Sequence, residues 1–236
     1  MARVLVTRPQ PGADTTAERL SALGHDVTTA PLFTVHSLQW SPPGEVIDAL
    51  MVTSANAMRL SGPLPEAWRA LPCYAVGEAT AKAAAERGFT RIIVGDGDAS
   101  ALAAQMAADG VGVALHLAGR EHRAVAGGAL RIVTCTVYAA DPVGRLGADV
   151  ESALSAGKVD RVLLYSARAA GAFAALMDGA GIDRGGVALG AMSDRVADAA
   201  GEGWRGIAVA PAPVEDQLFA ACGLLCDKPQ STVRDR

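Results

Sequence analysis

Short apolar runs alternate with amphipathic stretches along most of the chain. The runs lie at residues 2–7, 25–33, 49–53, 73–76, 91–94, 113–119, 130–138, 161–165, 187–190 and 206–210. The first amphipathic stretch, 13–23, places Ala17, Leu20 and Leu23 on one face and stops at Gly24, as a helix does. Because short apolar strands alternate with helical stretches, the pattern predicts a parallel α/β sheet.

Part of this pattern occurs twice. The segment DALMVTSANAMR at 48–59 matches DRVLLYSARAAG at 160–171, and YAVGEATAKAAAERG at 74–88 matches VALGAMSDRVADAAG at 187–201. The two matches keep the same order and almost the same offset. The repeat is far too long for a solenoid, so it indicates two copies of one domain.

The strand–helix–strand pattern at 2–36 also resembles the segment 113–138, with Arg8 and Arg120 at matching positions. The halves therefore alternate along the chain, and polar, Pro-bearing linkers lie near 37–44 and 139–147. This order predicts one domain inserted in the other, with two crossings that would form a hinge and a cleft. We expect residues 1–36 plus 143–226 to form a discontinuous α/β domain, 37–142 an inserted α/β domain, and 227–236 a disordered tail.

The composition narrows the class of protein. Half of the residues are hydrophobic and 19% are charged, which is typical of a soluble globular protein. The net charge of −4 argues against a general nucleic-acid binder. No apolar run is long enough to cross a bilayer or to serve as a signal-peptide core, so we expect a cytoplasmic protein without membrane contact.

The cysteines and histidines lack the spacing of a metal or redox site. We expect reduced structural thiols and no bound metal. The residues considered are Cys73, Cys135, Cys222, Cys226, His25, His36, His116 and His122.

Several hydroxyl side chains follow a predicted strand and open a predicted helix. Unpaired N–H groups and the positive end of the helix dipole make such turns anion sites, and a hydroxyl adds a donor. The alternative is ordinary helix capping, which stabilises by about 1 kcal/mol and needs no ligand. The candidate binding residues at these turns are Ser54, Ala55, Asn56, Gly77, Thr80, Ser100, Ser166 and Ser193.

Arg8 and Arg120 lie in the same kind of turn, and their matching positions favour contacts with anions over a solvated surface charge. Tyr138 ends a predicted strand near the expected hinge. A phenol there can donate a proton or a hydrogen bond to a leaving group, although the residues alone favour the structural alternative, an amphipathic aromatic at a domain boundary.

The order of these motifs resembles the uroporphyrinogen-III synthase family. The matching pieces include VLVTRP and APLF at the start, the two repeated segments, AGREHR, VTCTVY and VLLYSARAA. The resemblance implies two similar parallel-sheet α/β domains, one inserted in the other, joined by a two-stranded hinge. It also implies an enzyme without a metal or an organic cofactor.

The substrate implied by the resemblance is hydroxymethylbilane, a linear tetrapyrrole polycarboxylate. It loses its hydroxyl to give an azafulvene, ring D attacks through its substituted carbon, and a spiro intermediate reopens and closes with ring D inverted. Tyr138 matches the family tyrosine implicated in hydroxyl loss, and Thr80, Ser166 and Ser193 match hydroxyl positions around the family's cleft. Arg and N–H donors would hold the carboxylates while the protein sets the geometry of ring closure.

A second possibility is a non-catalytic two-domain module that binds or senses a small anion. A pure binder would need no proton donor at Tyr138. The sequence shows no exposed heptad or apolar stripe that requires a partner, so we expect a monomer.

Overall fold

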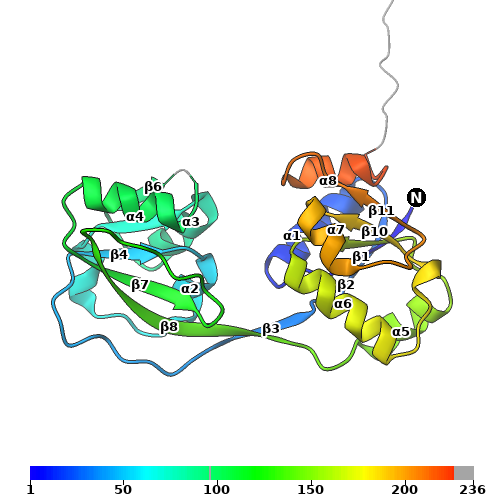
Figure 1. The fold of residues 1–236 in the computed structure, drawn as a ribbon, viewed down its shortest axis with the longest axis horizontal. Helices are drawn as coiled ribbons and strands as arrows, with labels where there is room; N and C mark the ends of the chain where they lie inside the picture. Colours follow the sequence, from blue (N-terminus) through cyan, green and yellow to red (C-terminus); the bar gives the residue numbers. More distant parts are fainter. Residues whose placement is uncertain (96, 226–236) are drawn as a thin grey trace, which may run out of the picture. The chain divides into compact units, whose positions relative to one another are not determined.

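The computed structural model describes residues 1–95 and 97–225 (Figure 1). The predicted tail at 227–236 and Cys226 lie outside the described residues. The chain divides into two compact units, the first formed by Met1–Thr34 together with the chain from Pro142 onward, the second by Val35–Asp141. The sequence places the corresponding limits at 36–37 and 142–143.

The first unit is a parallel sheet of five strands in the order β11-β10-β9-β1-β2. Leu20 and Phe219, from helices α1 and α8, pack on Val4 and Val6 of β1 in a buried core. The elements of this unit are β1 (Arg3–Val6), α1 (Gly12–Ala22), β2 (Asp26–Thr29), α5 (Ala148–Ser155), β9 (Arg161–Leu164), α6 (Ala167–Gly179), a 3₁₀ turn (Arg184–Gly186), β10 (Ala188–Ala191), α7 (Asp194–Ala200), β11 (Gly206–Val209) and α8 (Glu215–Ala221).

The second unit contains most of a six-stranded sheet in the order β3-β8-β7-β4-β5-β6. Helices α2 and α3 cover one face, where Met58 and Ala84 pack on Leu50 of β4. Helix α4 covers the other face, where Met106 packs with Met51. The elements of the second unit and its sheet are β3 (Phe33–Ser37), β4 (Ala49–Val52), α2 (Ala55–Leu60), a 3₁₀ turn (Glu66–Ala70), β5 (Cys73–Val76), α3 (Glu78–Glu86), β6 (Ile92–Gly95), α4 (Ala99–Ala108), β7 (Val113–Gly119) and β8 (Arg131–Pro142).

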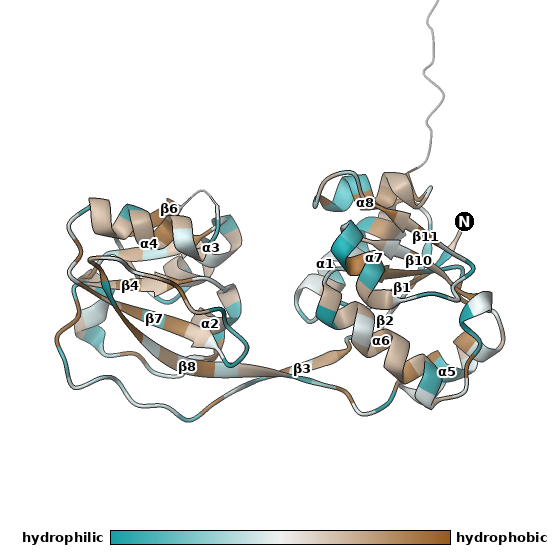
Figure 2. Ribbon diagram, viewed as in Figure 1, coloured by the Kyte–Doolittle hydropathy of each residue, from teal (hydrophilic) through white to brown (hydrophobic). Residues whose placement is uncertain are grey.

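The strand order repeats between the units, as the duplicated sequence requires. The repeated segments contribute β4 and β5 to the second sheet and β9 and β10 to the first. The order β11-β10-β9-β1-β2 therefore corresponds strand by strand to β6-β5-β4-β7-β8, and β3 is additional. Burial explains the continuous apolar runs: β4 is buried along its whole length, and the apolar colouring of β7 and β8 is visible in Figure 2.

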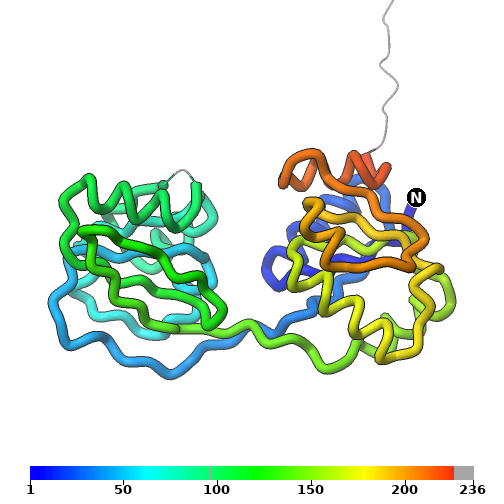
Figure 3. Tube along the Cα trace, in the orientation of Figure 1, coloured from blue at the N-terminus to red at the C-terminus, as the bar shows by residue number. Residues whose placement is uncertain are grey.

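Three predicted elements differ from the structure, and Figure 3 traces the path of the chain through them. The sequence predicts one strand over 25–33, but this run divides into β2 and β3, which join different sheets, because Pro31 lies between them and has no N–H for a strand ladder. The part of the presumed linker up to Pro142 belongs to β8. Residues 120–130, all described, form a loop without a helix, so the likeness of 113–138 to 2–36 holds for the strands alone.

The cysteines Cys73, Cys135 and Cys222 are free thiols. Within residues 1–95 and 97–225, no helix combines the length and apolarity that crossing a membrane requires. Across the same residues, no group of three or more His, Cys, Asp and Glu side chains is placed to hold a metal ion.

Candidate functional site

The candidate residues of the second unit gather at one edge of its sheet. Strands β4, β5, β7 and β8 run parallel, so their carboxyl ends meet at the same edge. Ser54 follows β4, Gly77 follows β5 and Arg120 follows β7. Tyr138 of β8 pairs with Gly119, the last residue of β7. In open parallel sheets this edge is where ligands bind.

Ser54 opens α2 as the sequence predicts. It lies in extended backbone, and its Oγ accepts a hydrogen bond from the Asn56 N–H at 3.2 Å. Ala55 is the first helical residue. The hydroxyl oxygen therefore serves as a cap, while its O–H can still donate to another group.

Gly77 precedes α3 and adopts a positive φ of 73°, a conformation that favours glycine. Thr80 is the third residue of the helix and is only 5% exposed. Its N–H donates to the Gly77 carbonyl at 3.2 Å, so this backbone donor is used within the first turn of the helix.

Ser100 does not cap α4, contrary to the prediction. The cap is Asp98, whose Oδ1 accepts from the N–H groups of Ser100 and Ala101 at 2.9 and 3.0 Å. Ser100 is an exposed residue inside the helix. Because the helix begins at Ala99, Asp98 is the residue placed to accept from the N–H groups of the first turn, and the helix dipole also stabilises its negative charge.

Two histidines also lie at this edge, and the sequence analysis assigned no function to either after excluding them as metal ligands. His116 is 2% exposed, and its Nε2 lies 3.1 Å from Thr53 Oγ1. Burial, assisted by the nearby His122, lowers the pKa of His116 to about 4, so the ring is neutral near neutral pH. The His122 ring meets the His116 ring edge-on at 5.8 Å between centroids, and His122 Nδ1 lies 2.8 Å from the Gly119 carbonyl oxygen. The sequence signal that could have identified His116 is its position as a polar ring within the apolar run VALHLAG.

Arg120 is held by acidic neighbours. Its Nε donates to Glu121 Oε1 at 3.0 Å, and its Nη2 donates to Asp141. Asp141 also lies 3.6 Å from His36 Nε2. A substrate carboxylate would have to share or displace these partners, because the guanidinium already has internal ones.

Arg8, at the matching position of the first unit, has the same kind of partner. Its Nη1 donates to Glu215 Oε1 at 3.2 Å, and its guanidinium lies 4.7 Å from the centre of the Tyr165 ring. The same carboxylate accepts from Thr16 at 2.6 Å and from Tyr165 at 2.9 Å, and its other oxygen accepts from Arg19. Burial, followed by the Glu215 charge, raises the pKa of Tyr165, so this phenol stays a donor.

The two hydroxyls predicted in the first unit differ in what they do. Ser166 caps α6 by accepting from the Ala169 N–H at 3.1 Å. Ser193 stands at the N-cap of α7, but among the described contacts its side chain makes no capping hydrogen bond. Its half-buried hydroxyl is therefore not committed to the helix start.

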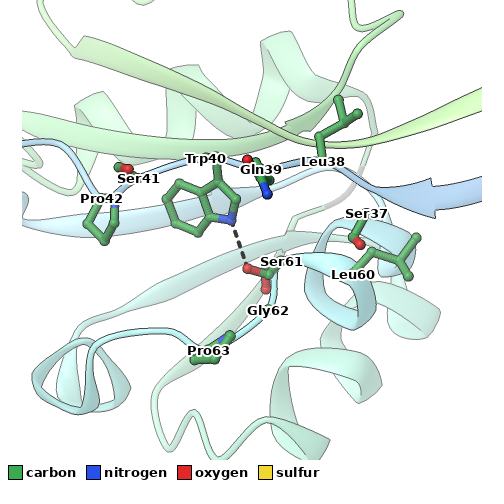
Figure 4. Close-up of a pocket in the computed structure, with 10 residues that line it drawn as sticks. All are labelled: Ser37, Leu38, Gln39, Trp40, Ser41, Pro42, Leu60, Ser61, Gly62 and Pro63. Carbon is green, nitrogen blue, oxygen red and sulfur yellow. Dashed lines mark hydrogen bonds between the residues drawn. The ribbon is translucent and has the colours of Figure 1, made fainter.

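A pocket of about 500 Å³ lies elsewhere in the second unit, between residues 37–42 and 60–63 (Figure 4). The Trp40 indole N–H donates to the Ser61 carbonyl at 2.8 Å across it. None of the predicted site residues lines this pocket, and none of its lining residues is charged. It therefore offers no cation for a carboxylate.

The fold and the sheet edges define a protein built from two related parallel α/β units with polar turns at the strand ends. Residues 14–220 match the family model of uroporphyrinogen-III synthase HemD. The chain belongs to this family, and it is thus an enzyme of the lyase class that acts in tetrapyrrole biosynthesis.

Solved structures support the fold. The uroporphyrinogen-III synthetase of Helicobacter pylori superposes with a TM-score of 0.66 at 15% identity, covering 96% of this chain and 100% of that one. A mutant uroporphyrinogen III synthase of the extremely thermophilic bacterium Thermus thermophilus gives 0.50 at 18% identity, with 94% and 96% covered. A comparison with curated protein sequences gave no match.

Proposed function

We propose that this chain converts hydroxymethylbilane to uroporphyrinogen III, with Tyr138 donating a proton or hydrogen bond to the departing hydroxyl. The family match is the observation that supports this reaction, and it favours a synthase over the non-catalytic anion-binding module. Tyr138 pairs with Gly119, the last residue of β7, and the Tyr138 carbonyl accepts from the Arg120 N–H at 2.9 Å; this position at the carboxyl edge of the sheet supports its role. Tyr138 is half-buried, with its ring packed on the core beneath α2 and α3.

The polar turns would hold the carboxylates of the bilane. In this proposal the donors are the hydroxyls of Ser54, Thr80, Ser166 and Ser193, the N–H groups of the turns at Ala55 and Gly77, and the side-chain amide of Asn56, whose backbone N–H already bonds to Ser54. Ser100 is a weaker candidate, because Asp98 takes its N–H and places a negative charge beside it. Arg8 and Arg120 would exchange an internal carboxylate for one from the substrate. We further propose that the protein acts as a monomer in the cytoplasm.

The chemistry sets the task of these residues. Loss of the hydroxyl creates an electrophile, and ring D must then attack through its substituted carbon. Because free bilane closes without help to isomer I, the protein must hold the chain in the geometry that gives isomer III. General acid assistance contributes roughly 10²–10⁴-fold to such steps.

The test couples the protein to a source of hydroxymethylbilane and separates the oxidised porphyrin isomers by chromatography. We expect mostly isomer III from the wild type. Tyr138→Phe should lower turnover by about 10²-fold and raise the share of isomer I, since the phenol hydroxyl is lost. Tyr74→Phe is the matched control, because the Tyr74 hydroxyl bonds to Asp109 and not to a residue of the sheet edge.

Two results would contradict the proposal. Only isomer I from folded wild-type protein would refute the synthase reaction and leave the binding module. Unchanged turnover in Tyr138→Phe would remove Tyr138 from the mechanism and leave the reaction itself in place.

A further inference from the structure

Strand β8 contains an irregularity just before Tyr138. Its register with β7 is regular from Val113 to Ala118, where Ala118 pairs with Thr136. The next residue of β7, Gly119, pairs with Tyr138, so Val137 has no partner of its own on β7. This is a β-bulge, a feature that bends a strand and changes the direction of a side chain.

The bulge decides which face of the sheet Tyr138 occupies. In a regular strand successive side chains alternate, so Tyr138 would share a face with Thr136 and oppose Val137. Instead, Val133, Cys135, Val137 and Tyr138 all pack with the cluster beneath α2 and α3. The extra residue therefore turns Tyr138 onto the face whose two helices begin at Ser54 and Gly77.

Gly119 makes room for the ring on this face. A Cβ added at Gly119 would lie 2.6 Å from Cζ, 2.8 Å from the hydroxyl oxygen and 3.0 Å from Cε1 of Tyr138. Ordinary carbon contacts lie at roughly 3.5–4.0 Å, so any side chain here would push the phenol end by about 1 Å. The phenol rests against a position where only glycine leaves it in place.

We propose that Gly119 and the bulge at Val137 position the Tyr138 phenol for hydroxyl loss, which makes Gly119 a positioning residue of the reaction. This inference rests on the proposed role of Tyr138. It goes beyond that role because it names the backbone device and the one residue that set the phenol's direction.

The contact predicts a specific signature for Gly119→Ala. The atoms that the new methyl group meets are the far end of a side chain, which can move without shifting the backbone. Stability should therefore change little, whereas a displacement of about 1 Å at a reacting group can cost up to about 10²-fold in rate. We expect kcat to fall by about 10-fold to 10²-fold, with a much smaller change in KM, because the carboxylate-binding turns stay in place.

The experiment is a double-mutant cycle. Gly119→Ala, Tyr138→Phe and the double variant are compared for kcat, KM and isomer ratio, with melting temperature measured for each. Gly206→Ala is the matched control: Gly206 is also a strand residue, but nothing lies within 4 Å of its added Cβ. If Gly119 acts through the Tyr138 hydroxyl, Gly119→Ala should slow the wild type but have little further effect in the Tyr138→Phe background.

The outcomes separate the two proposals. Unchanged turnover in Tyr138→Phe overturns the role of Tyr138. If Tyr138→Phe is slow but Gly119→Ala turns over at the wild-type rate, the positioning role alone is overturned. It is also overturned if Gly119→Ala lowers kcat by the same factor in the wild-type and Tyr138→Phe backgrounds. If Gly119→Ala folds poorly, adding Tyr138→Ala removes the ring and should restore folding; persistent misfolding would refute the contact.

Discussion

His116 should make the stability of the second unit depend on pH. In the unfolded chain its imidazole binds a proton below its ordinary pKa of 6.5, but in the folded unit burial delays protonation until about pH 4. Between these values the unfolded state binds more protons, so stability rises with pH and is lost as pH falls through this window. Stability falls with falling pH because the buried, neutral imidazole would have to acquire a charge.

The size of the effect follows from the shift. Integrating the linkage relation with these two pKa values gives a loss of about 2 kcal/mol between about pH 7 and pH 5, and about 3 kcal/mol once the pH is below both. A loss of about 2 kcal/mol is a large fraction of the stability of a small domain. The main cause is burial of the ring, and His122 is the second cause.

The assay is denaturant unfolding at several pH values, followed by tryptophan fluorescence. Trp40 and Trp68 belong to the second unit and Trp204 to the first, so a Trp204→Phe background reports on the second unit alone. His116→Gln, which cannot titrate, should lose about 2 kcal/mol less than its parent between the two pH values. Thr53→Val removes the hydrogen-bond partner of His116 but leaves the buried ring, so it should keep most of the pH dependence.

One result would refute the reasoning. If His116→Gln and its parent lose equal stability between about pH 7 and pH 5, His116 is not the group that titrates. Titration of the histidine ring protons by nuclear magnetic resonance provides an independent check, because the signal missing from His116→Gln identifies His116 and its pKa can be read directly. A value near the ordinary 6.5 would contradict the burial argument.

Two further predictions concern the contacts that hold the helices. Glu215→Ala should cost about 2 kcal/mol in thermal unfolding, because the buried Thr16 hydroxyl and the donors of Tyr165 and Arg8 would lose their acceptor. Asp216→Ala, at a side chain that is 64% exposed, should cost at most about 0.5 kcal/mol; similar losses in both variants would refute the central role of Glu215. Asp98→Ala should lower stability by about 1 kcal/mol and Ser100→Ala by almost nothing, and the reverse order would restore Ser100 as the cap.

The sequence predicts the strands and the helix starts well where the signals are local. Ser54 and Ser166 follow apolar strands and precede helical stretches, and both cap the helices that follow. The duplication also has a structural counterpart, because the pairing order of one sheet repeats in the other. These features depend on neighbouring residues or on a repeat that can be read directly.

The partners of the arginines could not be predicted in the same way. Arg8 meets Glu215, and Arg120 meets Asp141, only after the chain has folded. No local pattern distinguishes a guanidinium that awaits a substrate from one that already has a carboxylate. Asp98 and Ser100 show a subtler limit: both are good capping residues, and the choice between them depends on where the first helical turn begins.

Tyr138 shows how far the position of a side chain can depart from its sequence pattern. Strict alternation along 130–138 assigns its ring to the same face as Thr136, away from α2 and α3. The register with β7 reverses this assignment through one extra residue, and the room for the ring comes from Gly119, on another strand. Neither the bulge nor the missing Cβ has a signal within the run itself, since both exist only as a relation between two strands. Sequence alone can thus assign a side chain to the wrong face of a sheet, and in the proposed mechanism the glycine opposite Tyr138 is as specific a requirement as the phenol.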